Sequence, residues 1–178
     1  MKVAVTSRLM AQVINNLGAT PVTMPPPDFY ASLQRGTVDA GGIGWPGIAP
    51  FKLHEVTPYH MHASLTGEAN FTLMAKSAYD KVPEKGKSAI DRHAGMPYAL
   101  LWAKAIQAMD DQGIGIVKAA KQSIVTLAPA EEARWKERAK SVVDAWVAST
   151  PDGPKVLAAY RAEVAKVRAE AEKVGVEK

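Results

Sequence analysis

The sequence predicts an α/β fold built on a mainly parallel sheet, and two observations lead to this prediction. From Lys2 to Ala40, short Val- and Thr-rich runs alternate with helical segments in the order strand, helix, strand, helix, strand. This spacing favours right-handed crossovers between parallel neighbours. After Pro83 the composition becomes Ala-rich with helical periodicity, so we expect helices to dominate the second half of the chain.

The first unit is predicted to be a strand over Lys2–Thr6 followed by a helix over Arg8–Leu17. Ser7 immediately precedes the helix, and a Ser side chain at this position can cap the first free backbone N–H groups. Gly18 follows the last apolar residue, where helices commonly end with a left-handed residue. Residues adjacent to the helix therefore predict both its start and its end.

The second unit begins with a predicted strand over Thr20–Met24. Pro25–Pro27 cannot continue the ladder, and Pro27 suits the first turn of a short helix that stops at Gly36. Thr37–Ala40 is predicted to return as a third strand.

The loop Gly41–Gly47 follows this third strand and is the best candidate for a binding surface. In open parallel sheets, ligands bind beyond the carboxyl ends of the strands. The loop is rich in Gly and contains Trp45, whose ring could form an aromatic wall of a ligand pocket. The alternative is a core Trp that closes the end of the sheet.

Three further strands are predicted, over His54–Tyr59, Ala69–Lys76 and Ser123–Leu127. A helix is expected over Pro129–Val147, and a last helix from about Lys155. The apolar stripe of that last helix is narrow, which predicts packing on a neighbouring helix or on another chain.

A long helical region is predicted from Glu84 to about Gln122. Pro97 within it predicts a kink, and Gly113 with Gly115 predicts a weak point.

Composition excludes several classes of protein. The net charge is +4, but the basic residues are interleaved with Glu, which is typical of solvated helix faces and not of a nucleic-acid partner. The chain has no Cys, so disulfides and thiolate metal sites are excluded. No run reaches the roughly 18 apolar residues of a membrane span, and Met1 directly precedes the first strand with no secretory leader.

The motifs of catalysis and cofactor binding are also missing. The Gly-rich loop lacks the spacings that cradle phosphates, and no nucleophile elbow is present. His54, His60 and His62 suggest a metal site, but no third ligand stands at a fixed spacing, so solvated or core His is the expectation. We therefore predict no enzyme, no cofactor and no metal. A hydrolase that uses Asp39 with a His is a weak alternative.

A series of motifs resembles the DctP-type solute receptors of tripartite ATP-independent periplasmic (TRAP) transporters. It consists of LGATPVTMPPPDFYASLQRGTVDA, the Gly-rich loop with Trp45, PFKLHEVTPYH and LMAKSAYDKVPEKGKSAID. The resemblance covers nearly the whole chain and implies the C-terminal portion of a longer receptor.

The fold implied by this resemblance is a periplasmic-binding-protein-like type II lobe with a long spanning helix and C-terminal helices. Residues 1–66 would form ligand-binding lobe two, and 67–83 a returning strand and turn of lobe one. Residues 84–122 would form the spanning helix, and 123–178 a strand and the C-terminal helices packing on lobe two.

The resemblance also implies a periplasmic protein that captures a small organic anion, expected to be a carboxylate, and delivers it to the TRAP membrane permease subunits. The implied ligand-binding positions are Trp45, Gly44, Pro26, Phe71 and Ala4. At the position of Ala4 the family usually has an Arg that pairs with the substrate carboxylate. The alternative function is a self-associating helical module, with a homodimer formed through exposed helices.

Overall fold

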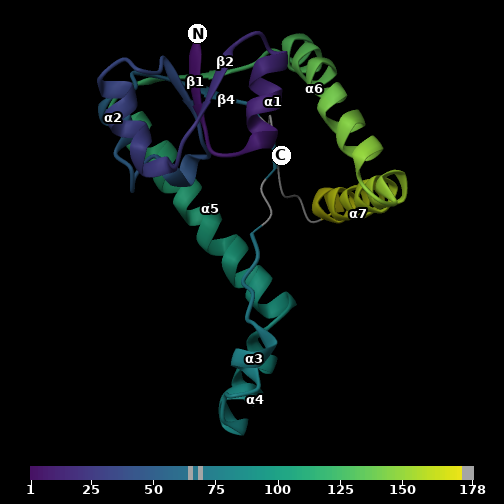
Figure 1. The fold of residues 1–178 in the computed structure, drawn as a ribbon. Coiled ribbons are helices and arrows are strands. Elements are labelled where there is room, and N and C mark those ends of the chain that lie inside the picture. Colours follow the sequence, from purple (N-terminus) through teal and green to yellow (C-terminus); the bar gives the residue numbers. More distant parts are fainter. Residues whose placement is uncertain (64–65, 68–69, 174–178) are drawn as a thin grey trace.

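The centre of the fold is a parallel three-stranded sheet in the order β2-β1-β3. The computed structural model describes residues 1–63, 66–67 and 70–173 (Figure 1). The strands are β1 (Lys2–Val5), β2 (Thr20–Thr23) and β3 (Ala40–Gly42), with β1 parallel to both neighbours. The predicted α/β fold with a mainly parallel sheet is confirmed.

Helix α1 (Arg8–Asn16) covers one face of this sheet. The hydroxyl of Ser7 accepts a hydrogen bond from the backbone N–H of Met10 at 3.2 Å, which confirms the predicted N-cap. The helix ends at its C-cap Leu17, and Gly18 takes a φ of +87° as predicted. Ile14 packs with the buried side chains of β1 that point to this face.

The opposite face of the sheet carries the main core. The 3-10 turn η1 (Pro26–Asp28) leads into α2 (Phe29–Gln34), which buries Phe29 completely. Side chains alternate between the two faces along a strand, so Ala4 points to this core while its neighbours point to α1. The buried members of the cluster are Ala4, Phe29, Val38, Ile48, Leu53 and Val117.

The third strand lies further along the chain than predicted. The backbone N–H groups of Thr37 and Val38 donate to the carbonyl of Ser32 in α2, at 3.0 and 3.4 Å, and so are not available to the sheet. Ladder pairing with β1 begins only at Ala40. The predicted strand Thr37–Ala40 is therefore wrong in all but its last residue.

A second, two-stranded parallel sheet joins β4 (Tyr59–His62) to β5 (Ser123–Thr126), which confirms the predicted strand near Ser123. The predicted strand His54–Tyr59 is wrong in all but its last residue, because β4 begins only at Tyr59. A 3-10 turn, η3 (Leu53–Glu55), stands there, and the Thr57 hydroxyl donates to the Leu53 carbonyl at 2.7 Å. This local bond keeps the chain compact until β4 begins.

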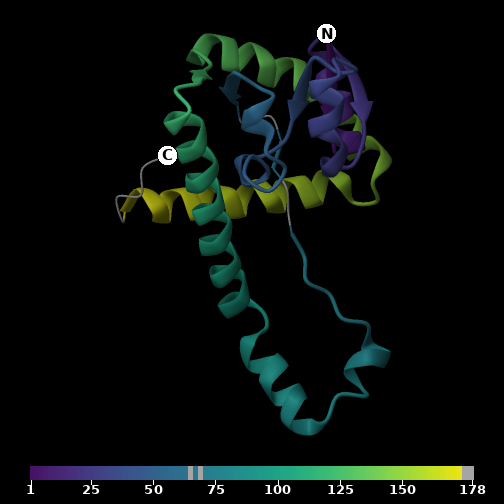
Figure 2. The same ribbon diagram turned by 90° about the vertical axis from the view of Figure 1, so that its left-hand side faces the viewer.

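An arm projects from the sheets (Figure 2). It contains α3 (Lys76–Tyr79), α4 (Glu84–His93) and the amino-terminal half of α5 (Met96–Ala119). The predicted kink at Pro97 is a complete break two residues earlier, where Gly95 has a φ of +68°. Pro97 then lies in the first turn of α5, where its missing N–H leaves no partner unsatisfied.

The segment that leads into the arm is irregular. A strand is predicted over Ala69–Lys76, but residues 70–75 form no strand in this structure and Lys76 already belongs to α3. Ala69 lies outside the described residues. Alternating apolar residues form a strand only beside a partner strand, and neither described sheet pairs with this segment.

The last two helices are α6 (Pro129–Ser149) and α7 (Gly153–Lys173), close to the predicted bounds. Helix α6 packs against α1, where the Asn16 side-chain amide donates to the Arg138 carbonyl at 3.2 Å and to the Ser141 hydroxyl at 2.9 Å. Helix α7 turns back along α6. In the described part of the chain, no helix combines the length and apolar character that a bilayer crossing requires.

Candidate functional site

The carboxyl ends of the three parallel strands meet at one edge of the sheet. The loop after β3 carries Gly44 and the 3-10 turn η2 (Trp45–Gly47), and the loop after β2 carries Pro26. Gly44 is exposed, and Trp45 and Pro26 are half-buried. The structure therefore places Gly44, Trp45 and Pro26 at the edge where ligands bind in open parallel sheets.

Trp45 is held by a hydrogen bond from the second sheet. Its indole Nε1–H donates to Nδ1 of His62, the last residue of β4, at 3.0 Å. The two ring planes are inclined by only 19° and their centroids are 6.1 Å apart, so the rings are nearly parallel. The hydrogen bond and this orientation join the Trp45 loop to the end of β4 at the carboxyl edge.

His60 lies on the same face of β4 and also contacts Trp45, with ring centroids 5.9 Å apart and an inclination of 32°. Its orientation is fixed from the other side by Gln122, the residue before β5. The Gln122 amide donates from Nε2 to the His54 carbonyl at 2.6 Å, so its Oε1, 3.0 Å from His60 Nε2, accepts from that ring. His60 is thus engaged with Gln122, whereas His62 is engaged with Trp45.

The long helix α5 supports the Trp45 loop through close backbone packing. Gly113 is buried against η2, and a Cβ built there would overlap the carbonyl oxygen of Trp45 and come within 3.4 Å of Ile48 Cβ. The predicted weak point at Gly113 and Gly115 is wrong, because α5 continues through both. Gly113 instead allows the helix to approach the loop that carries Trp45.

Asp110 adds an ionisable group on the same side of α5, one turn before Gly113. Burial raises the pKa of the Asp110 carboxyl above its ordinary value, and the neighbouring Asp111 carboxylate raises it further. A positive charge on His62 would act in the opposite direction on this pKa. The site therefore combines an indole, two imidazoles and a carboxyl group from three different elements.

Ala4 and Phe71 do not join this cluster. The Ala4 side chain is fully buried in the core, whereas Phe71 is 78% exposed. The residue after Phe71, Thr72, donates its hydroxyl to Tyr98 Oη at 2.9 Å near the start of α5. Tyr98 lies about 15 residues before Gly113, roughly 22 Å along the helix. Ligand contacts by the five predicted residues stay a prediction.

Sequence reasoning assigned no site role to His60, His62 and Asp110. The His-x-His spacing on a strand was the available signal, because it places both rings on one face. No group of three or more metal-ligating side chains occurs within the described residues. Asp39 accepts from the backbone N–H of Lys2 at 2.6 Å, at the amino end of β1, and so lies at the edge opposite the one that carries His62.

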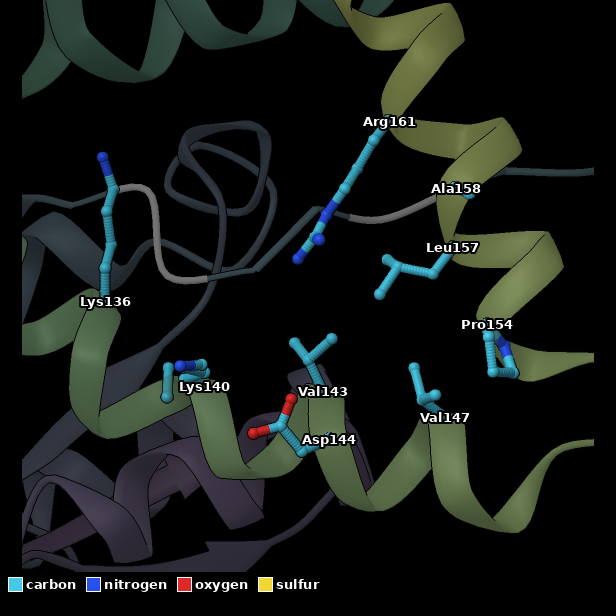
Figure 3. Close-up of a pocket in the computed structure, with 10 residues that line it drawn as sticks. Lys136, Lys140, Val143, Asp144, Val147, Pro154, Leu157, Ala158 and Arg161 are labelled. Atoms are coloured by element: carbon cyan, nitrogen blue, oxygen red, sulfur yellow. The ribbon is translucent and has the colours of Figure 1, made fainter.

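A separate cavity of about 500 Å³ lies between α6 and α7 (Figure 3). Arg161 and Leu157 reach from α7 toward α6, where Lys140 and Val143 lie. None of the residues predicted to contact ligand lines this cavity, and neither does any aromatic side chain. The strand-end edge with Trp45 and His62 therefore remains the candidate site.

This arrangement of parallel strands, crossover helices and a strand-end aromatic loop is the fold of a solute-binding protein. The model of the DctP family, bacterial extracellular solute-binding protein family 7, matches residues 1–150. The chain belongs to this family, which confirms the predicted DctP-type TRAP receptor.

Similar solved structures and curated relatives agree with this family assignment. The chain is 29% identical to a TRAP solute-binding protein of Rhodoferax ferrireducens T118 solved with copurified benzoate, with a TM-score of 0.85, covering 96% of this chain and 56% of that one. A marine metagenome TRAP protein in complex with metahydroxyphenylacetate is 26% identical, with a TM-score of 0.83 and coverage of 93% and 55%. The ectoine-binding periplasmic protein TeaA of Halomonas elongata is 27% identical over 175 residues, covering 94% of this chain and 50% of TeaA. The chain thus spans about half the length of these relatives.

Proposed function

We propose that this chain forms the second lobe and spanning helix of a TRAP-type receptor, which captures a small organic anion in the periplasm and delivers it to a membrane permease. The observation that supports this most is the similarity, over 96% of the chain, to a TRAP receptor solved with benzoate. The family consists of solute-binding proteins, so we assign no catalysis to the site.

The ligand class we propose is a planar aromatic carboxylate. The rings of Trp45 and His62 are nearly parallel, so the half-buried indole offers a flat aromatic face on which an aryl group can stack. Two of the similar structures hold aromatic carboxylates, which supports the same class. Ala4 supplies no guanidinium for bidentate pairing with a carboxylate, so stacking becomes a larger part of recognition.

The arm is proposed to contact lobe one of the receptor. The exposed apolar side chains of the arm support a contact with lobe one, since a solvated surface rarely presents so many large apolar side chains together. They include Phe71, Leu73, Met74, Met96, Leu100, Leu101 and Trp102. In this proposal 67–83 belongs to lobe one, α5 runs across both lobes, and 123–178 packs on lobe two.

Calorimetric titration of the complete gene product with benzoate, malonate and neutral benzamide tests the function. We expect heat with benzoate and none with benzamide. Trp45→Ala should weaken benzoate binding roughly tenfold, because the aryl ring loses its stacking partner.

Trp146→Ala is the matched control, because Trp146 is 39% exposed on α6, a helix whose main packing partners are α1 and α7. It should leave the benzoate affinity unchanged. The absence of heat and of any thermal shift across a panel of mono- and dicarboxylates would contradict the anion assignment.

Self-association is a second candidate function, favoured by the exposed stripe on α7. Val156, Tyr160 and Val167 are 47%, 65% and 61% exposed and share one helix face. If this stripe forms a homodimer, sedimentation velocity will show a dimer at micromolar concentration that Tyr160→Lys dissociates. A monomer at every concentration would remove this candidate.

A further inference from the structure

The hydrogen bond between Trp45 and His62 fixes the protonation state of the imidazole. An indole Nε1–H can only donate, so Nδ1 of His62 must be an unprotonated acceptor at 3.0 Å. The remaining proton of the neutral ring is then on Nε2. His62 is exposed, so protons from solvent can reach this ring freely.

We propose that His62 is a positioning residue for Trp45, which holds the indole only in its neutral form, so that capture of a planar aromatic carboxylate weakens as the pH falls. The class of ligand in this inference rests on the proposed function. The coupling between the imidazole and the indole rests only on the hydrogen bond between them and is independent of the ligand.

Protonation of His62 places a second N–H directly opposite the indole N–H. Two donors cannot bond to each other, so the contact at 3.0 Å is lost. The ionisable groups around His62 are Asp110 on α5, with Asp111 beside it, and His60 on β4, which already bonds Gln122.

Protonation of His62 affects only the Trp45 ring, because the Trp45 backbone is held by a separate contact with α5. The carbonyl of Trp45 packs against Gly113 of α5, and this contact contains no titratable group. Loss of one neutral hydrogen bond corresponds to roughly a two- to tenfold change in the population of the held orientation. We expect a change of that size in ligand affinity.

The ligand-free protein tests the coupling directly. The Trp45 indole N–H resonance, assigned with Trp45→Phe, is followed by NMR from about pH 8 to about pH 5, the range in which imidazole titrates. We expect it to move with pH in the wild type and in His60→Gln. It should be insensitive to pH in His62→Gln, whose amide oxygen accepts the same bond without titrating.

Benzoate affinity over the same pH range tests the consequence. A carboxylate stays ionised there because carboxyl groups titrate near about pH 4. Wild type and His60→Gln should lose roughly two- to tenfold in affinity toward low pH, whereas His62→Gln should retain high affinity at every pH. His62→Leu, which has no acceptor, should bind weakly throughout.

Two results would overturn the inference: a wild-type indole resonance that does not respond to pH, or His62→Gln retaining the wild-type pH dependence. A pH-dependent indole in a protein that binds no carboxylate would support the coupling and reject the proposed ligand class.

Discussion

Replacing Gly113 with alanine is expected to destabilise the 178-residue chain by about 1–3 kcal/mol. The new Cβ would overlap the carbonyl oxygen of Trp45, and backbone cannot rotate away as a side chain can. Either α5 or η2 must move, and both belong to the main core through Val117 and Ile48. Urea denaturation measures the free energy of unfolding, and near-UV circular dichroism reports the displacement of Trp45.

Gly115→Ala is the matched control, because it makes the same change two residues further along the same helix. Gly115 is exposed and a Cβ there would meet nothing within 4 Å. Alanine is the better helix former, so this variant should gain up to about 1 kcal/mol. The two variants should therefore differ by roughly 1–4 kcal/mol, and equal stability of both would show that Gly113 is not a close-approach position.

The elements that the sequence predicted well are those whose signals are local. The Ser7 cap needs only the backbone N–H of Met10, and Gly18 needs only a left-handed φ. Where strand prediction failed, hydrogen bonds to a neighbouring turn or helix end, which the side-chain pattern does not reveal, decided the outcome. Thr37 and Val38 have strand-like side chains, but their N–H groups bond to Ser32 at the end of α2.

The candidate site could be predicted only in part, because only some of its residues carry a local signal in the sequence. Gly44 and Trp45 stand out because a Gly-rich loop after a strand is visible in the sequence. The link to His62 depends on β4 pairing with β5, more than sixty residues later in the chain, which no local pattern specifies. Asp110 reaches the site only because Gly113 lets α5 approach the loop.

Phe29→Ala is expected to cause the largest loss of stability, about 3–5 kcal/mol. Phe29 is fully buried and packs with Leu53 and Val117 in the main core. A Cβ built on Gly41 of β3 would lie only 3.1 Å from its Cδ2 atom, so the strand backbone rests directly on this ring. Truncation leaves a cavity that helix and strand cannot close together, because β3 is fixed by its pairing with β1. Thermal and urea unfolding measure the effect.

Phe71→Ala removes the same atoms from a side chain that is 78% exposed, and should change the free energy of unfolding of this chain by no more than about 0.5 kcal/mol. Because domains are stable by only about 5–15 kcal/mol, the loss at Phe29 would take a large part of the total. It would also loosen β3, the strand from which the Trp45 loop departs, so ligand binding should fall together with stability. A Phe29→Ala variant within about 1 kcal/mol of Phe71→Ala would mean that β3 is supported mainly by its ladder with β1 and not by the core beneath it.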